Sequence, residues 1–298
     1  GGGGGGGKDT VENAIVICPN CMKRIWNSLE GSTIKRLYNK DLLDLNINTP
    51  STEEQQKIGD FFSKLDRQIE LEEKKLDLLE EQKKGYMQKI FSQDLRFKDD
   101  NGNDYPEWKE FKLKDVFFKK KGKGLSKNKL DLDGKYQCLL YGELYTHYKE
   151  VINGVFSRTN EWEGVLSLKN DLLFPNSTTT NAWDLATFSC FKQENVLLGG
   201  DITILRPRHQ DIESVFFAYY LSNYDPLRKI IASYGQGITI VHLYFNHIKD
   251  VIINLPNIEE QQKIGYFFNN LDHRIELQSQ KIESLKTQKQ GFLQKMFV

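Results

Sequence analysis

Features of membrane and secreted proteins are missing from this sequence of 298 residues. It has no signal-peptide pattern and no run of about 18 apolar residues, the length of a membrane-spanning helix. Its four cysteines, Cys18, Cys21, Cys138 and Cys190, are few and unevenly spaced, which does not suit a disulfide framework. We therefore expect a cytoplasmic protein with reduced thiols and no membrane partner.

The sequence also has no excess of positive or of negative charge. The chain has 41 Lys and Arg residues and 41 Asp and Glu residues, so its formal net charge is zero. The whole chain therefore gives no electrostatic signal for or against nucleic acid, and any basic surface has to be local.

Motifs of self-contained enzymes are missing as well. The five histidines form no HxH, HExxH or HxE pattern, and GxxxxGK[ST] and GxSxG do not occur. GxGxxG occurs only within the seven glycines at the start. The segment Asn176–Asn181 has some likeness to an NPPY base-flipping loop, but it lacks the prolines and the aromatic residue, and no glycine-rich methyl-donor site precedes it. We therefore exclude a self-contained methyltransferase and predict no catalytic residue.

What the sequence does contain is a long internal repeat. Residues 53–91 match residues 259–297 at 22 of 39 positions, with a constant offset of 206 and no gap. The same offset pairs upstream residues, from Thr33 with Thr239 to Pro50 with Pro256. A match of this length does not arise from composition, so the chain carries an internal duplication.

Apolar residues recur in each copy at alternating spacings of four and three, which is a heptad seam. The first copy has Leu65, Ile69, Glu72, Leu76, Leu79, Lys83, Tyr86 and Ile90 at the seam, and the second has Leu271, Ile275, Gln278, Ile282, Leu285, Lys289, Phe292 and Met296. A stripe this narrow on a long helix is buried only against a matching helix. We therefore predict helices over residues 53–92 and 259–298 that pair through the apolar members of this seam.

Both predicted helices have a start signal. Ser51 or Thr52 can cap the first helix, with Glu54 or Gln55 closing a capping box. Asn257 is the expected cap of the second helix.

A glycine also stands near the end of each predicted helix, at Gly85 and Gly291. Glycine inside a helix costs about 1 kcal/mol relative to alanine. Its recurrence in both copies indicates either the close approach of a partner backbone or a local break in the helix.

The region between the repeats has the pattern of a linker followed by a mixed domain. Residues 93–107 are polar and rich in turn residues. Residues 108–258 contain short runs of Val, Ile, Tyr and Phe that predict strands. Only Val215–Asn223 and the PLRKIIAS segment after it predict helix. The fold class is therefore α+β, a mixed α/β domain joined to two long helices.

The first 31 residues are expected to be a flexible or unassigned lead. Seven glycines cannot pack. Cys18 and Cys21 have the CxxC spacing of a zinc knuckle, and the surrounding ENAIVICPNC looks like the end of an HNH-type nuclease module. Met22 stands where a histidine is expected, and only two of four ligands are present. We therefore favour a remnant and predict no metal site.

Three polar stretches of the middle domain are candidates for contact with DNA. The segment 118–129 carries six lysines and no acid, and such a segment can lie along phosphates. The amide and hydroxyl groups of 176–181 suit base edges. Gln236, between Gly235 and Gly237, can pair with adenine. The candidate residues are Lys119, Lys120, Lys121, Lys123, Ser126, Lys127, Lys129, Asn176, Ser177, Thr178, Thr179, Thr180, Asn181, Tyr234 and Gln236. A solvated charged face and a plain turn are the alternatives for the first two stretches.

The duplicated EEQQKIG helices, each preceded by a variable segment, resemble the specificity subunits of type I restriction-modification enzymes. GGDITILRP, YYLSN and HLYFNHIKDVIINLP extend the resemblance, which covers about Ser32 to Val298. It implies target-recognition domains that each read one half of a split double-stranded DNA sequence. It also implies that the two helices pack as an antiparallel coiled coil that spaces the domains, and that methyltransferase subunits dock on them.

The resemblance further implies a subunit without catalysis of its own. S-adenosylmethionine, Mg and ATP are then expected only in the methyltransferase and restriction subunits, and this chain has no cofactor. The surface outside the helix pair, including Glu72, Lys75, Gln280 and Lys281, would face the partners.

In that family the first recognition domain is about as long as the second, yet here only residues 32–52 would remain of it. We therefore expect a reader of one half-site, which can pair with a second specificity chain. Two alternatives stay open: a coiled-coil adaptor that does not bind DNA, and an HNH-like zinc nuclease remnant.

Overall fold

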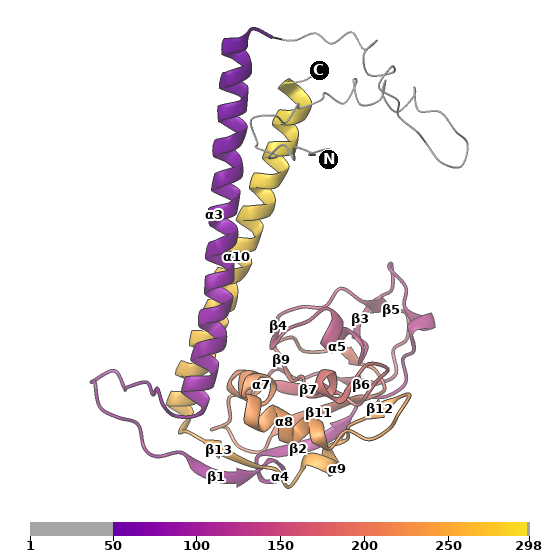
Figure 1. Cartoon of the computed structure of the whole chain (residues 1–298). Coiled ribbons are helices and arrows are strands. Elements are labelled where there is room, and N and C mark those ends of the chain that lie inside the picture. The colour runs from indigo at the N-terminus through magenta and orange to yellow at the C-terminus, as the bar shows by residue number, and fades with distance from the viewer. Residues whose placement is uncertain (1–49, 297–298) are drawn as a thin grey trace, which may run out of the picture. The chain divides into compact units, whose positions relative to one another are not determined.

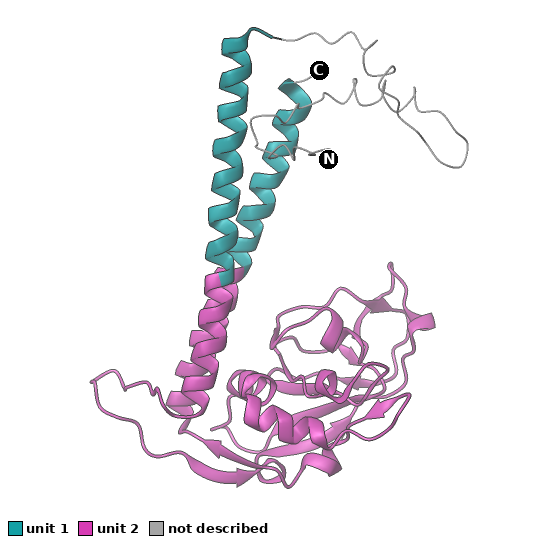
Figure 2. Cartoon of the chain, in the orientation of Figure 1, with its two compact units in different colours: residues 1–77, 276–298 teal, residues 78–275 magenta. Residues whose placement is uncertain are grey.

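The computed structural model describes residues 50–296, which form two compact units (Figure 1, Figure 2). Two long helices, α3 (Thr52–Phe91) and α10 (Ile258–Met296), each contribute to both units. In the described part of the chain, unit 1 consists of residues 50–77 and 276–296, and unit 2 of residues 78–275. The predictions for residues 1–49, including Cys18 and Cys21, lie outside the described residues.

Both long helices begin at the predicted caps. The backbone N–H of Glu54 donates to Ser51 Oγ at 3.3 Å, so Ser51 rather than Thr52 is the cap of α3. The backbone N–H of Glu260 donates to Asn257 Oδ1 at 3.0 Å in the same way. The two repeats therefore start their helices with the same local chemistry.

In unit 1 the helices α3 and α10 run antiparallel. The rings of Phe61 and Phe292 lie 5.1 Å apart between centroids, whereas Glu73, further along α3, pairs with Lys286, earlier in α10, at 2.8 Å. Ile69 and Ile282 are buried at this seam. The antiparallel helix pair that was expected from the family resemblance is therefore confirmed.

The other predicted pairing residues differ in burial. Leu79, Leu271 and Ile275 are buried, Leu65, Leu76 and Leu285 are half-buried, and Tyr86 and Phe292 are exposed, although each makes an edge-to-face contact with another ring. Burial at the seam therefore varies without falling toward its ends, since Leu271, the first seam residue of the second copy, and Ile90, the last of the first, are both buried.

The expected position of Glu72 outside the helix pair is wrong. Gln278 Nε2 donates to Glu72 Oε2 at 2.7 Å, and Lys281 Nζ lies 2.5 Å from Glu72 Oε1. The seam register turns Glu72 toward α10, where it binds both partners. Lys75 and Gln280 are exposed, as expected.

A local break at the repeated glycines is also wrong. The helix α3 continues through Gly85 and α10 continues through Gly291. A Cβ atom built at either position would have no neighbour within 4 Å. The described chain therefore brings no backbone close to these glycines.

Unit 2 contains two sheets of four or five strands and two separate strand pairs. The larger has the strand order β2-β11-β7-β9-β4, and all its pairs are antiparallel except β4 with β9. Its strands are β2 (Phe117–Lys121), β11 (Ile202–Pro207), β7 (Asp171–Pro175), β9 (Ser189–Phe191) and β4 (Val151–Ile152). The smaller sheet, in the order β5-β3-β10-β6, consists of β5 (Arg158–Thr159), β3 (Tyr136–Leu139), β10 (Leu197–Leu198) and β6 (Val165–Leu166).

Two further strand pairs and several helices complete unit 2. The pairs are β1 (Lys109–Lys112) with β13 (Ile252–Leu255) and β8 (Ser177–Thr178) with β12 (Val241–His242). The predicted helices are α7 (Ser214–Asn223) and α8 (Asp225–Ser233), and the short helices α4 (Leu113–Val116), α5 (Glu143–Thr146), α6 (Ala182–Leu185), α9 (Phe245–Ile248) and η2 (Lys127–Lys129) were not predicted. Strands and helices alternate in the chain, which confirms a mixed domain.

The strand β7 is buried on both faces. Leu172 and Phe174 pack into a core that includes α7 and the adjacent ends of α3 and α10, whereas Leu173 packs into a second core with Leu139 and Ile204. Successive residues of a strand point to opposite faces, so one continuous apolar run can serve both cores.

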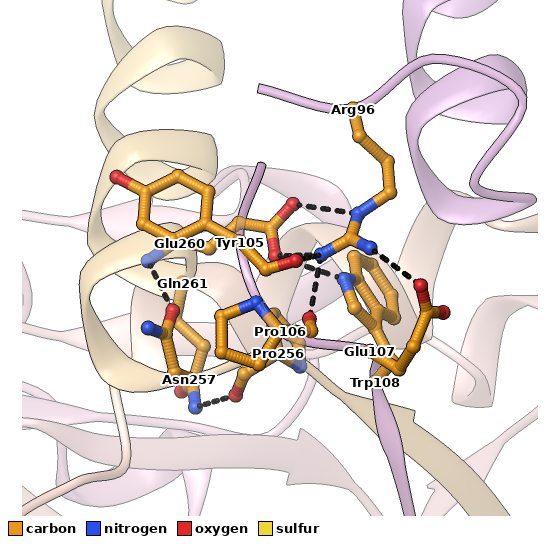
Figure 3. A network of polar contacts seen from close by, with 9 residues as sticks. All are labelled: Arg96, Tyr105, Pro106, Glu107, Trp108, Pro256, Asn257, Glu260 and Gln261. Carbon is orange, nitrogen blue, oxygen red and sulfur yellow. Dashed lines mark hydrogen bonds and ion pairs between the residues drawn. The ribbon is translucent and has the colours of Figure 1, made fainter. Parts of the chain in front are cut away.

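A polar network ties the linker of unit 2 to the start of α10 (Figure 3). The carboxylate of Glu260 is fully buried and accepts two hydrogen bonds from Arg96, at 3.2 and 2.8 Å. Trp108 Nε1 donates to the same carboxylate at 3.0 Å. Arg96 also donates to the backbone oxygens of Tyr105 and Pro106. Because a buried carboxylate needs a full set of partners, this network fixes the path of residues 96–108.

Candidate nucleic-acid interface

Three strand ends meet at one end of the larger sheet. The pairing of Lys121 with Thr203, and of Ile202 with Pro175, places the end of β2, the start of β11 and the end of β7 next to one another (Figure 1). The run Lys119–Lys121 therefore points toward the segment that follows β7, which is the polar stretch 176–181. The sheet register brings together two predicted stretches that lie far apart in the sequence.

The first half of that polar stretch serves the fold. Asn176 is buried, and its Nδ2 lies 2.7 Å from Thr203 Oγ1 and 2.9 Å from the backbone oxygen of Leu243. Ser177 and Thr178 are also buried, in β8. The prediction that Asn176 contacts DNA does not fit this geometry, because its amide is already occupied inside the domain.

The second half of the stretch is exposed. Thr179, Thr180 and Asn181 lie at the surface just before α6. Asn181 caps this helix by accepting from the backbone N–H of Trp183 at 2.9 Å, and Thr180 Oγ1 bonds to the carboxylate of Asp184. Unlike Thr180 and Asn181, Thr179 has a hydroxyl that forms no hydrogen bond to another residue of the described loop or of α6.

The third predicted stretch, which contains Tyr234 and Gln236, is connected to the same end of the larger sheet by β12. His242 pairs with Ser177 and Val241 with Thr178. Gln236 and His242 exchange two backbone hydrogen bonds, at 2.9 and 2.7 Å, and so close a turn over residues 237–241. The side chains of Gln236 and of Tyr234, which is 42% exposed, face solvent.

Lysines are distributed unevenly around this surface. Lys121 Nζ lies 5.8 Å from the ring centroid of Tyr244 and 3.8 Å from Asp201 Oδ1. Lys119, Lys120 and Lys123 are exposed on or after the edge strand β2.

The other part of the basic segment lies elsewhere in unit 2. Lys129 Nζ pairs with Glu161 at 3.0 Å, and the hydroxyl of Ser126 bonds to Asn128. Lys127 and Lys129 form η2 beside residues 131 and 159–161 rather than beside β8. The six lysines therefore do not form one patch.

Two contacts of aromatic side chains beside the candidate interface were not predicted from the sequence. His242 and Tyr244 stack with centroids 5.7 Å apart, and Arg228 lies 4.2 Å above the exposed ring of Trp183. Burial lowers the pKa of the Arg228 guanidinium. His242 and Tyr244 are only two residues apart, whereas Arg228 and Trp183 lie 45 positions apart and only the fold brings them together.

Both cysteines of the described residues, Cys138 and Cys190, are buried inside unit 2. Burial raises the pKa of Cys138 to about 11 and of Cys190 to about 12, so both thiols stay protonated at neutral pH. Within residues 50–296, no group of three or more His, Cys, Asp or Glu side chains could hold a metal ion. No helix in this part of the chain is long and apolar enough to cross a membrane.

The architecture, a mixed domain between two long repeat helices, is that of type I specificity subunits. The S subunit of a type I restriction-modification system from M. genitalium has a TM-score of 0.56 and 19% identity, over 93% of this chain and 69% of that chain. A structure described as the basis of complex assembly and conformational transition of the type I R-M system has a TM-score of 0.54 and 18% identity, over 93% and 67%. At these identities the likeness shows the fold alone.

The sequence assigns the family. The model of the type I restriction modification DNA specificity domain matches residues 8–81 and 105–287, and the chain belongs to this family. A putative type I restriction enzyme MjaX specificity subunit from Methanocaldococcus jannaschii is 23% identical over 259 residues, which are 85% of this chain. The chain covers 58% of that relative's length. The resemblance expected from the repeat is therefore confirmed.

Proposed function

We propose that the chain is the DNA-recognition subunit of a type I restriction-modification complex and that unit 2 reads one half of a bipartite target. The observation that carries this proposal is the convergence of Lys121, the loop at Thr179 and the turn at Gln236 on one end of the larger sheet. Lysines there would neutralise phosphates, and the polar groups would read base edges. The family of the chain supports the same reading.

The first repeat supports a bipartite target. In unit 2, Gly265 lets Val215 of α7 approach, because a Cβ at this position would lie 3.2 Å from the Cγ1 atom of Val215. Asp272 accepts a hydrogen bond from the hydroxyl of Tyr219 at 2.6 Å. Thus α10 carries a set of residues that hold the recognition domain in place.

The equivalent residues of α3, at an offset of 206, are Gly59 and Asp66. A Cβ at Gly59 would meet nothing within 4 Å, and the side chain of Asp66 is 53% exposed. The first helix thus repeats the residues that hold the domain in unit 2, and within the described part of unit 1 no domain packs on them. A second recognition domain, in the same protein or in a second specificity chain, fits these residues.

Partner subunits would use the exposed faces of the helix pair. Lys75 and Gln280 are exposed there, and Gly85 and Gly291 leave open backbone surface in both repeats. We assign methyltransferase subunits to these faces and the restriction subunit to the assembled complex. S-adenosylmethionine, Mg and ATP would bind to those subunits, and this chain would position them without catalysis of its own.

The test is co-purification with the cognate modification subunit, followed by mapping of adenine methylation on DNA with and without this chain. A new methylated motif that depends on the chain is the expected result. The motif should be lost in a K121A/K123A/Q236A variant and kept in K169A, because Lys169 precedes β7 at the opposite end of that strand. A stable complex that methylates no motif, together with the absence of salt-dependent DNA binding, would instead favour the coiled-coil adaptor.

A further inference from the structure

The turn between Gln236 and His242 has a fixed backbone. Gly237 adopts φ +124°, and a Cβ at this position would lie 2.0 Å from the backbone oxygen of Ile240, so only glycine fits. A Cβ at Gly235 would lie 2.6 Å from the Cβ of Ala182, which seats the turn against α6. The segment is therefore held at its ends, on β8 and on α6, while its tip projects into solvent.

The tip of this turn presents an apolar side chain. Ile238 is 100% exposed. A single exposed apolar residue needs no partner by itself. Ile238 differs from an ordinary surface residue because it stands on a fixed turn, two residues from Gln236, and this turn leads into the β12 strand that pairs with β8.

The internal repeat shows which residues of this turn are the same in both copies and which are changed. At an offset of 206 the first copy keeps Gly31 for Gly237, Leu37 for the buried Leu243 and Tyr38 for the half-buried Tyr244, and also Thr33 and Ile34 for the exposed Thr239 and Ile240. It changes both the exposed residues beside Gly237, with Glu30 for Gln236 and Ser32 for Ile238, and the half-buried pair Val241 and His242, with Lys35 and Arg36. The first copy thus keeps the glycine that the turn requires and changes the two exposed side chains, Gln236 and Ile238, on either side of it.

Two copies that read different half-sites need this division, because a common scaffold sets the position and variable side chains set the sequence. We infer that the turn Gln236–His242 determines which bases unit 2 reads, with Ile238 contacting the 5-methyl group of a thymine and Gln236 pairing with an adenine. This inference rests on the proposed DNA-recognition function. Its chemistry is that of the major groove, where only thymine presents a methyl group and adenine offers N6 and N7 to an amide.

The test exchanges outward side chains between the two copies. The full chain, as wild type, I238S and Q236E, selects sequences from a random double-stranded DNA library at fixed salt. We expect the wild type to enrich a motif with A·T pairs. I238S should lower the preference for thymine at one position by about fourfold, the effect of losing one buried methyl contact. Q236E should shift one position from adenine toward cytosine, whose N4 donates to a carboxylate.

The control variant is L132S. Leu132 is 95% exposed in the same unit, in the loop after η2, so its loss tests exposed apolar surface in general. L132S should leave the motif unchanged, and all variants should bind bulk DNA within about twofold of the wild type, since phosphate contacts set that affinity.

A second perturbation identifies the methyl contact. Replacing the selected thymine with uracil removes only the methyl group, so it should weaken the wild type and leave I238S unaffected. An unchanged motif in I238S and Q236E would overturn the inference while leaving the proposed function in place. Uniform weakening of I238S on all sequences would also overturn it. If the wild type shows no salt-sensitive DNA binding, the proposed function itself fails, and the inference with it.

Discussion

The side-chain amide of Gln278 donates to the carboxylate of Glu72 at 2.7 Å, and these two residues occupy the same position of the two repeats. The same repeat position of α3 and of α10 therefore lies on both sides of one contact. Such a contact arises where two equivalent helices pack against each other through the same surface, as in the self-complementary interface of a homodimer. The duplication has thus made a homodimer-like contact within one chain.

Other contacts repeat with the roles of the copies exchanged. Lys83 pairs with Asp272 in unit 2, at 2.5 Å, and Lys289 pairs with Asp66 in unit 1. The ring contacts follow the same rule: Tyr86 with Phe267, and Phe61 with Phe292, both edge to face. One set of seam residues therefore encodes both halves of the helix pair.

Replacing Gln278 with glutamate should destabilise unit 1. Q278E places a second carboxylate against Glu72, and like charges at a helix seam repel. Thermal unfolding followed by circular dichroism should show a lower Tm at pH 7, and the loss should shrink below about pH 4, where carboxylates protonate. Q288E, on the exposed face of α10, is the control and should leave Tm unchanged. An equal Tm in Q278E would show that the two positions do not meet.

The carboxylate of Glu72 should also give the wild type an acid-sensitive stability. Hydrogen bonds from Gln278 and Lys281 lower the pKa of Glu72 below its ordinary 4.5. A carboxyl group with a lowered folded-state pKa stabilises the fold above its unfolded pKa, and this contribution is lost as pH falls through the folded value. E72Q should therefore reduce the fall in Tm on acidification from pH 6 to pH 3. A parallel acid limb in wild type and E72Q would contradict the assignment.

The buried network at Glu260 should be the most sensitive polar site of unit 2. E260Q removes the charge that faces Arg96 and Trp108, and breaking a buried ion pair costs about 3 kcal/mol. Urea denaturation measures the loss. The matched control is E54Q, because Glu54 holds the equivalent position in the first repeat but is exposed. Equal effects of E260Q and E54Q would show that the network adds nothing to stability.

The helices and their caps could be predicted because they depend on local pattern. Heptad spacing located both long helices, and Ser51 and Asn257 have the side chains that cap a helix start. The side of the helix on which a polar seam residue lies was harder to predict. Glu72 was expected to face partners although it also stood at a seam position of the heptad pattern, and the structure shows it bonded to Gln278 at the seam.

The candidate interface could be predicted only in parts. The three polar stretches were visible in the sequence, but their meeting depends on the register of β2, β11 and β7, which no local pattern encodes. The burial of Asn176 and the separation of Lys129 from Lys121 follow from the same tertiary pairing. The contact of Arg228 with Trp183 gave no signal until the fold was known, because these residues lie 45 positions apart in the sequence.

Glycines at equivalent positions should respond in opposite directions to alanine. G265A would place a Cβ 3.2 to 3.3 Å from Val215 and from the backbone of Phe216, neither of which can move freely, so we expect a loss of about 1–2 kcal/mol. G59A meets open space and should gain up to about 1 kcal/mol of helix propensity. Urea denaturation of both variants checks the signs. A stabilising G265A would show that α7 is not tightly seated on α10.

Lysines at the end of β2 should set the salt dependence of DNA binding. Each phosphate contact contributes about 0.9 to the slope of log affinity against log salt, so K119A/K121A should lower the slope by about 2. Fluorescence anisotropy with a labelled duplex at several salt concentrations measures it. K169A also removes an exposed positive charge from unit 2, but it lies before β7, at the far end from Lys121, and should leave the slope unchanged. A similar decrease in slope in K169A would mean that the chain attracts DNA through diffuse charge, and that the sheet end where Lys121, Thr179 and Gln236 converge is not the contact surface.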